Sequence, residues 1–469
     1  LDAPGASLPT VWSTRGAAEA LASMAEVAVG VLGVALTVIS IIVELAANRY
    51  TPRITEEFLT DRVNALALSC FVLTTLLIVW IALTVSGASR ALPWLTLAGA
   101  ALVSLSLLAL LPYFAYVFDF LSPHRLIQRN ADAARHLLGA SHPAPARVTH
   151  HIDQIGDIAV RSIQNQDKAI ALTALEEIAH LLGEVRARRH DLDAAWAADA
   201  DTLAADPDFA AFHRSVLEDV RGCWLEMKLL LQLAAAWREA QRGPRDVAHL
   251  IAIQMRRHGQ AATLHDDRDS LLLTTRFLNT LLRNAVNVGD VRSAYNLLNE
   301  YRELLDTLLG SALAAEVPRL AEQLQSYGLL AFRRQLAFVL ETVAYDLCTL
   351  LERAHALRSV HHDALLRTLL DIDREPEGFA VQESALRGVR KAQVKLALFY
   401  LHEGREDHAR LIWQDMRREP SARLDSIREE LQRTVERQYW EITDRGTNFD
   451  WLDPHRRAHL PTFFSWFDA

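Results

Sequence analysis

The sequence predicts an all-α protein in which N-terminal transmembrane helices are followed by a large cytosolic α-helical domain. Three observations lead to this fold class. Before residue 120 the chain contains three apolar runs without a charged residue, at 27–43, 63–89 and 91–118. From residue 150 onward apolar residues recur at helical spacing, without runs of alternating β-branched residues. The net charge of −9 comes entirely from residues 149–469, because residues 1–148 carry nine Arg and nine acidic residues.

The apolar runs define the expected domains. A spanning helix needs about 20 apolar residues, so the second and third runs are long enough and the first is short. We predict a transmembrane domain at 1–120, with helices at about 25–47, 63–88 and 91–118. A helical extension that continues the third helix to about 140, and then a linker, is expected at 121–148. A first cytosolic helical module at 149–235 precedes a module of helical hairpins at 236–469, which ends in an aromatic tail.

Arginine placement predicts the orientation. Three Arg lie within 49–62 and three within 125–135, whereas the turn at 86–90 holds only Arg90. Since cytoplasmic loops carry the excess of positive charge, the 49–62 segment and everything after 120 are expected in the cytoplasm. The three cysteines are far apart and fit neither a disulfide framework nor a zinc site. Only four of the 49 basic residues are lysine. We take this as an indication of a bacterial source, and therefore expect an inner-membrane protein whose bulk is cytoplasmic.

The first helix differs from the other two because it carries a polar stripe. Six small or polar residues recur at spacings of 4, 3, 4, 3 and 4, which places them on one face. They are Glu26, Gly30, Gly33, Thr37, Ser40 and Glu44. In one interpretation the four central residues form a packing seam against another helix, and the two Glu reach the headgroups. In the other, several copies of this helix surround a water-filled path with carboxylate rings at its mouths.

The remaining membrane segments have simpler patterns. The second and third helices are apolar on all sides, which is typical of an outer, lipid-facing layer. Between the first two helices, Thr51 and Pro52 are expected to start a short amphipathic helix at the cytoplasmic surface. Such a helix would either couple the cytosolic part to the first helix or act as a plain connector. The residues assigned to coupling are Pro52, Arg53, Phe58 and Arg62.

The stretch from about 17 to about 180 resembles a bacterial family of predicted membrane proteins, domain of unknown function family twenty-two fifty-four. The resemblance is carried by the small-residue helix that runs into 50–54, by Phe58-Leu59 and Asp61-Arg62, by the two helices after them, and by 156–162. It implies an integral inner-membrane protein with a further helix before residue 1, and it implies no activity. The sequence departs from the family after Ser162, where Gln164-Asn165-Gln166-Asp167 replaces a Pro-Gly turn.

The cytosolic part shows a weak repeat. Gly243, Gly289 and Gly404 are each followed five residues later by an alanine in an apolar helix. The last of these resembles a tetratricopeptide unit, with a helix, a turn and a second helix packed back on the first. The spacings of 46 and 115 residues predict a degenerate helical-hairpin solenoid instead of a regular array. Such a domain either binds a partner on a concave surface or assembles the oligomer. The aromatic tail is expected to dock on its own or a neighbouring subunit.

We expect no enzyme, no cofactor and no metal site. The histidine clusters at 150–151, 265–269 and 361–363 lack metal-ligand spacing and are interpreted as surface residues. The chain has neither a phosphate loop nor a nucleophile elbow, and its acidic soluble part argues against nucleic acid.

The function we predict is an oligomeric, cation-leaning ion channel or pore with a cytosolic assembly or gating domain. The alternative is a membrane-tethered scaffold or signalling protein whose helical repeats bind a cytosolic partner. A transporter has little support, because the three spans show no internal repeat.

Overall fold

The computed structural model of the chain describes residues 14–52, 54–86, 93–140, 145–189, 196, 200–372, 383–438, 444–446 and 448–468. Over these residues the protein is helical and contains no strand, which confirms the predicted all-α class. The chain divides into two compact units. Unit 1 comprises residues 1–136 and 150–177, and unit 2 comprises 137–149 and 178–469. Each unit is described by itself below.

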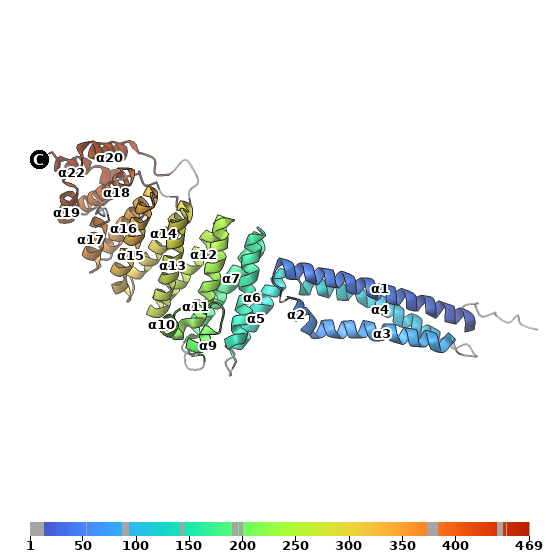
Figure 1. Cartoon of the computed structure of the whole chain (residues 1–469). Helices are drawn as coiled ribbons and strands as arrows, with labels where there is room; N and C mark the ends of the chain where they lie inside the picture. Colours follow the sequence, from blue (N-terminus) through green and yellow to red (C-terminus); the bar gives the residue numbers. More distant parts are fainter. Residues whose placement is uncertain are drawn as a thin grey trace, which may run out of the picture. The chain divides into compact units, whose positions relative to one another are not determined.

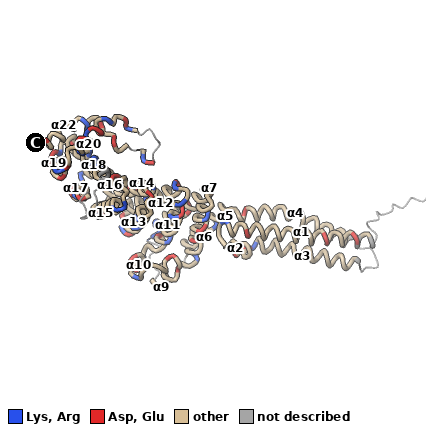
Figure 2. The backbone as a smooth tube through the Cα atoms, turned by 45° about the horizontal axis from the view of Figure 1, so that its top comes forward, with Lys and Arg blue, Asp and Glu red and all other residues tan. Residues whose placement is uncertain are grey.

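Unit 1 contains three long apolar helices that pack on one another (Figure 1). They are α1 (Thr14–Arg49), α3 (Arg62–Ser86) and α4 (Pro93–Phe120). Each has a segment long and apolar enough to cross a membrane, at Glu19–Arg49, Arg62–Val85 and Trp94–Phe120. In Figure 2 most of their length carries no charged residue. These helices confirm the three predicted spans. The predicted turn at 86–90 falls largely on residues 87–92, outside the described part of the chain.

The three helices meet along an apolar seam. On α1 the buried side chains recur on one face, at Leu21, Ala28, Ala35, Ile39 and Val43. On α4, Gly99 permits close approach, because a Cβ at this position would lie 2.5 Å from Cδ2 of Leu21. Small residues at such contacts let the backbones of membrane helices approach each other. The outward surfaces of α3 and α4 are apolar, with exposed side chains such as Leu76, Trp80 and Leu108.

Shorter helices complete unit 1. They are α2 (Ile54–Thr60), α5 (Pro123–Leu138), α6 (Pro145–Gln164) and α7 (Lys168–Ala187), the last three extending partly beyond the unit. The extension expected to continue the third helix is instead a separate helix, since α4 ends at Phe120 and Pro123 opens α5. Proline fixes its own φ and lacks an N–H group, which makes it a natural first residue of a new helix.

The predicted start of α2 is also wrong. The described part of the helix begins at Ile54, and the buried Thr51 hydroxyl, which was expected to cap it, has no hydrogen-bond partner among the described residues. Thr51 therefore does not act as a side-chain N-cap.

Unit 2 is a stack of helical hairpins. Its helices are α9 (Ala200–Ala204), α10 (Arg214–Asp219), α11 (Trp224–Arg242), α12 (Arg245–Leu264), α13 (Arg268–Val288), α14 (Val291–Leu309), α15 (Val317–Arg333), α16 (Ala337–Ala356), α17 (His362–Leu370), α18 (Glu383–His402), α19 (Glu406–Met416), α20 (Ser421–Arg433), α21 (Pro454–Arg457) and α22 (Leu460–Ser465). Helices α12, α14, α16 and α18 contact one another in sequence, as do α11, α13, α15 and α17. The stack therefore has two rows (Figure 1), which confirms the helical-hairpin prediction.

The hairpin turns recur at regular spacing. Five hairpin turns in the described part of unit 2 place one residue in the left-handed region, at Asp266, Gly289, Gln335, Arg358 and Gly404. Successive members of this set lie 23 or 46 residues apart. At each turn the next residue donates its N–H to a carbonyl five residues back, the longer of the two bonds of a Schellman cap. The repeat is therefore a 46-residue helix pair, within the length of HEAT-type repeats and longer than a tetratricopeptide unit.

The aromatic tail docks on its own chain. Phe463 and Phe464 are buried, and α21 and α22 contact α18. The indole of Trp466 lies 6.3 Å from that of Trp413 on α19, at an interplanar angle of 76°. This arrangement confirms docking within the subunit, one of the two places expected for the tail.

The left-handed turns predict opposite effects of two substitutions. Gly289→Ala should destabilise the protein by about 1 kcal/mol, since a Cβ is disfavoured at φ +75° although no atom lies within 4 Å of it. Gln335→Gly, at φ +62° on the surface, should relieve the same penalty and raise the melting temperature. Thermal unfolding followed by circular dichroism in detergent measures both. A Gly289→Ala variant as stable as the parent would contradict this account.

Candidate functional site

The polar stripe lies on the exposed side of α1. All six residues, Glu26, Gly30, Gly33, Thr37, Ser40 and Glu44, are exposed. A Cβ added to Gly30 or Gly33 would find no atom within 4 Å, so the two glycines are not contact points for α3 or α4. The apolar seam occupies the opposite face of the helix. The stripe therefore has no packing partner within the described part of this subunit.

The two carboxylates of the stripe form no polar contact with the residues that the structure describes. Neither Glu26 nor Glu44 takes part in a hydrogen bond or ion pair with a described residue, whereas the Thr37 hydroxyl donates to the Gly33 carbonyl at 2.8 Å. Their positions differ by 18 residues, or about 27 Å along a helix. This is close to the thickness of the hydrocarbon core, about 30 Å, so each carboxylate falls near one edge of a bilayer.

The C-terminal end of α1 is held by the turn between α6 and α7. Arg161 donates to the carbonyl of Asn48 at 3.2 Å, and the Asn165 side chain donates to the carbonyl of Arg49 at 3.4 Å. The guanidinium of Arg49 pairs with Asp167 at 3.1 Å. The last carbonyls of a helix lack partners within the helix, so these donors cap α1.

Helix α2 makes side-chain contacts with both α4 and α5. Ile54 and Phe58 are buried, and the Phe58 ring meets the Phe120 ring edge to face at 5.8 Å. Glu57 forms an ion pair with Arg129 of α5 at 2.5 Å, and the same guanidinium lies 4.1 Å from the centre of the Phe120 ring. The short helix is thus attached on its apolar side and on its charged side.

Asp61 connects α3 with α4. Its carboxylate accepts a hydrogen bond from the backbone N–H of Asn64 at 3.0 Å, which caps the start of α3. The same oxygen accepts a hydrogen bond from the Tyr116 hydroxyl at 2.9 Å. One side chain therefore fixes both the start of the second span and the end of the third.

The residues predicted for coupling differ in their surroundings. Phe58 packs as described above, whereas Pro52 and Arg62 are exposed and Arg53 lies outside the described residues. The residues that make the contacts and were missed are Glu57, Asp61, Arg129, Arg161 and Asp167. A sequence signal existed for two of them, because Glu57 and Asp61 lie one helical turn apart in the short segment before the second span.

Unit 2 offers a second candidate site on the row formed by α14, α16 and α18. A non-helical segment around Phe449 lies against this row, and it lines a cavity of about 680 Å³. The Phe449 ring stacks on Tyr345 at 4.3 Å and 7°. Lys395 donates to the carbonyls of Phe449 and Trp451, each at 2.7 Å, and burial lowers the Lys395 pKa to about 8. A segment of the chain itself thus lies on the row formed by α14, α16 and α18.

Comparison with known proteins identifies the membrane part. Residues 2–151 match a family model described as Predicted membrane protein (DUF2254). This confirms the resemblance found in the sequence, and the chain carries the apolar helices expected of a membrane protein. No curated protein and no solved structure matches the chain.

The Asp61 contacts predict a measurable coupling. Asp61→Ala removes the cap of α3, which should lower the free energy of unfolding by about 1 kcal/mol. It also removes the acceptor of the Tyr116 hydroxyl, so the total loss should be larger. Tyr116→Phe should cost less, since the cap remains. Thermal unfolding of both single variants and of the double variant in detergent gives the interaction free energy. Strictly additive effects would show that the two side chains act independently.

Proposed function

We propose that this chain is the protomer of a homo-oligomeric, cation-selective channel in a bacterial inner membrane, a non-enzymatic protein whose helical-hairpin unit lies in the cytoplasm. The observation that supports the proposal is the exposed stripe on α1, which ends in Glu26 and Glu44 and contacts no other helix of the subunit. It combines small, hydroxyl-bearing and charged residues on a membrane helix that is otherwise apolar.

The physical argument concerns where such a stripe is stable. A carboxylate costs about 2.5–3.5 kcal/mol at the centre of a spanning helix and less towards its ends, and charged residues in spans usually face protein or water. Arranging copies of α1 around an axis, with α3 and α4 outside, removes the stripe from lipid. Glu26 and Glu44 then form carboxylate rings at the two mouths, and such rings favour cations.

A route for gating follows from the contacts at the end of α1. Arg161, Asn165 and Asp167 contact the last turn of the stripe helix; Arg161 lies in the last turn of α6, and the other two lie in the connection to α7. A movement of this turn would rotate or tilt α1 and change which side chains face the axis. We propose that the cytosolic part acts on the path through this cap.

The channel proposal predicts currents that depend on the stripe. Purified protein in planar bilayers should show unitary currents carried preferentially by K⁺ over Cl⁻, and Glu44→Gln should reduce that preference because it neutralises one carboxylate ring. Reversal potentials in asymmetric KCl measure the preference. Glu429→Gln, which removes an exposed carboxylate of unit 2, is the matched control and should leave the selectivity unchanged.

Cysteine cross-linking tests the assembly on which these currents depend. Ser40→Cys places a thiol on the stripe, and Ala35→Cys places one on the buried face of α1. Both variants are made in a chain whose Cys70, exposed on α3, is replaced by Ser. Oxidation in membranes should give covalent dimers with Ser40→Cys and none with Ala35→Cys. Absence of dimers with Ser40→Cys, or of currents across a range of voltage, tension and pH, would reject the channel.

A membrane-tethered scaffold is the second candidate, favoured by the segment around Phe449 that lies on α14, α16 and α18. A stacked ring and two buried carbonyl contacts are the kind of features by which helical repeats hold a peptide. In this proposal a cytosolic partner presents a similar aromatic peptide to the same surface. The membrane helices then serve as an anchor.

The scaffold predicts binding in trans. A synthetic peptide of residues 444–453 should bind the full-length protein when Phe449→Ala has weakened its own segment, and it should bind the parent protein less tightly. Fluorescence anisotropy of the labelled peptide measures both affinities. The same peptide with alanine at the Phe449 position is the control. Equal affinities of the two peptides would exclude recognition of the aromatic ring.

A further inference from the structure

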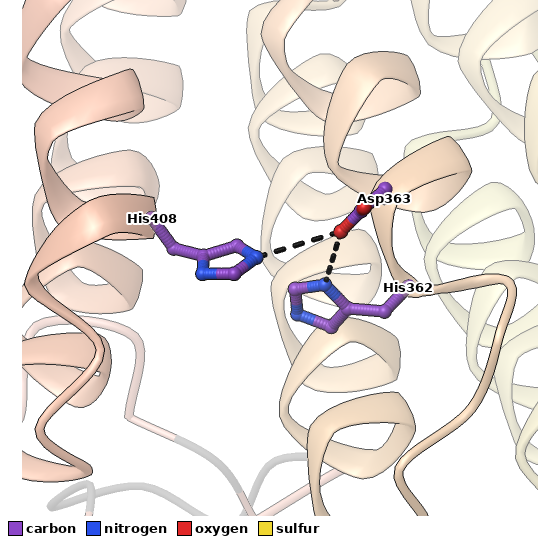
Figure 3. Close-up of side chains that lie close together, drawn as sticks. All are labelled: His362, Asp363 and His408. Carbon is purple, nitrogen blue, oxygen red and sulfur yellow. Dashed lines mark hydrogen bonds and ion pairs between the residues drawn. The ribbon is translucent and has the colours of Figure 1, made fainter.

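Consecutive hairpins of unit 2 bring two histidines together. His362 opens α17 and His408 lies in the first turn of α19, and each follows a left-handed turn residue by four positions. The two positions are one 46-residue repeat apart and therefore equivalent in the stack. Asp363 lies between the imidazoles, as Figure 3 shows, with Oδ1 3.2 Å from Nδ1 of His362 and 3.4 Å from Nε2 of His408.

The burial of His362 contradicts the surface interpretation of the 361–363 cluster, and His408, which lies outside that cluster, is buried beside it. His362 is 8% exposed and His408 is 6% exposed, while the Asp363 side chain is 80% exposed. The sequence separates His408 from the cluster by a whole helix pair, so only the stacking of hairpins reveals the group. The exposed carboxylate leaves a path from solvent to the two ring nitrogens.

The second nitrogen of His362 is hydrogen-bonded, and the second nitrogen of His408 lies close to a carboxylate without forming a hydrogen bond. The Tyr400 hydroxyl lies 2.8 Å from Nε2 of His362, and Oδ2 of Asp407 lies 3.0 Å from Nδ1 of His408. Histidines that bind metals almost always engage their other ring nitrogen with an oxygen in this way, because the contact fixes the tautomer and the ring orientation. Nδ1 of His362 and Nε2 of His408 are the nitrogens that face Asp363.

The two distances from the Asp363 oxygen to the nitrogens suit a tetrahedral ion, and the two nitrogens have to move closer together when the ion binds. Bonds of about 2.0–2.1 Å place tetrahedral ligand atoms about 3.4 Å apart, close to both nitrogen–oxygen distances given above. The three atoms all lie within 4.8 Å of one another.

We propose that His362, Asp363 and His408 bind a divalent transition-metal ion, Zn²⁺ being the best match, at the joint between the last two hairpins. Two nitrogens and one oxygen occupy three positions, and the fourth stays open to water. The ion links α17 to α19. The site is independent of the proposed channel and of the peptide surface, because it uses no residue assigned to either.

The positively charged guanidinium of Arg405 lies beside the proposed site and disfavours a bound metal ion. Nη2 of Arg405 lies 3.3 Å from Nε2 of His408, where it occupies the approach to that nitrogen. The guanidinium also pairs with Asp407 at 3.0 Å, and the side chain is about half exposed, so it is able to swing into solvent. Arg405 therefore weakens metal binding without preventing it. The alternative is that Asp363 only hydrogen-bonds the two histidines and no metal ion binds. In that case a substitution of Arg405 does not change the affinity for zinc.

Metal binding to the full-length protein in detergent tests the proposal. After chelator treatment and gel filtration, the protein is equilibrated with ZnCl₂, and bound zinc is measured by elemental analysis. Co²⁺ serves as a spectroscopic probe, since its visible absorption is intense in a tetrahedral site. We expect one Zn²⁺ per chain and a rise in melting temperature with zinc. His408→Ala should abolish both, and Tyr400→Phe should weaken binding about 10-fold.

The controls separate this site from the other histidines of the chain. His361→Ala removes a neighbouring imidazole that contributes no ligand and should leave binding unchanged. Asp363→Asn changes an exposed side chain, so it keeps the fold while weakening the site even if His408→Ala does not fold. Arg405→Gln should tighten zinc binding. Zinc stoichiometry and affinity that stay the same in Asp363→Asn and Arg405→Gln would overturn the proposal.

Discussion

The apolar seam of α1 determines how the rest of unit 1 is arranged. Leu21, Ala28, Ala35, Ile39 and Val43 face α3 and α4, and Gly99 gives Leu21 the room it needs. Van der Waals packing is the main attraction between helices in lipid, so the face with the better fit turns inward. The polar stripe lies opposite this face and is therefore directed outward. Its exposure is a direct consequence of the seam.

Polar contacts concentrate where the helices leave the apolar zone. Asp61 joins α3 to α4, Glu57 joins α2 to α5, and Asp167 joins α1 to the turn before α7. Near the membrane surface a carboxylate is partly hydrated, so its pairing costs less than at the bilayer centre. These contacts join the ends of the three spans to one another and to the helices around them.

The sequence predicts the helices and the stripe well because both depend on local spacing. Runs of apolar residues define α3 and α4, and the alternation of steps of four and three places Glu26 and Glu44 on one face. The regular repeat of unit 2 was hidden because Asp266, Gln335 and Arg358 hold positions at which a glycine is expected. The approach of His362 to His408 depends on tertiary stacking over 46 residues, and no local pattern contains it.

The contacts at the end of α1 also determine the azimuth of its stripe. A helix of 36 residues is about 54 Å long, which exceeds the hydrocarbon core, so its last turn extends beyond the lipid. A rotation of α1 about its own axis by 100°, the angle between successive residues, would turn the whole stripe away from its present direction. Arg161 and Asn165 donate hydrogen bonds to the last carbonyls of α1, and Asp167 forms an ion pair with Arg49. Because a helix transmits torsion as a nearly rigid rod, these three side chains set the direction of Glu44 and Glu26 together.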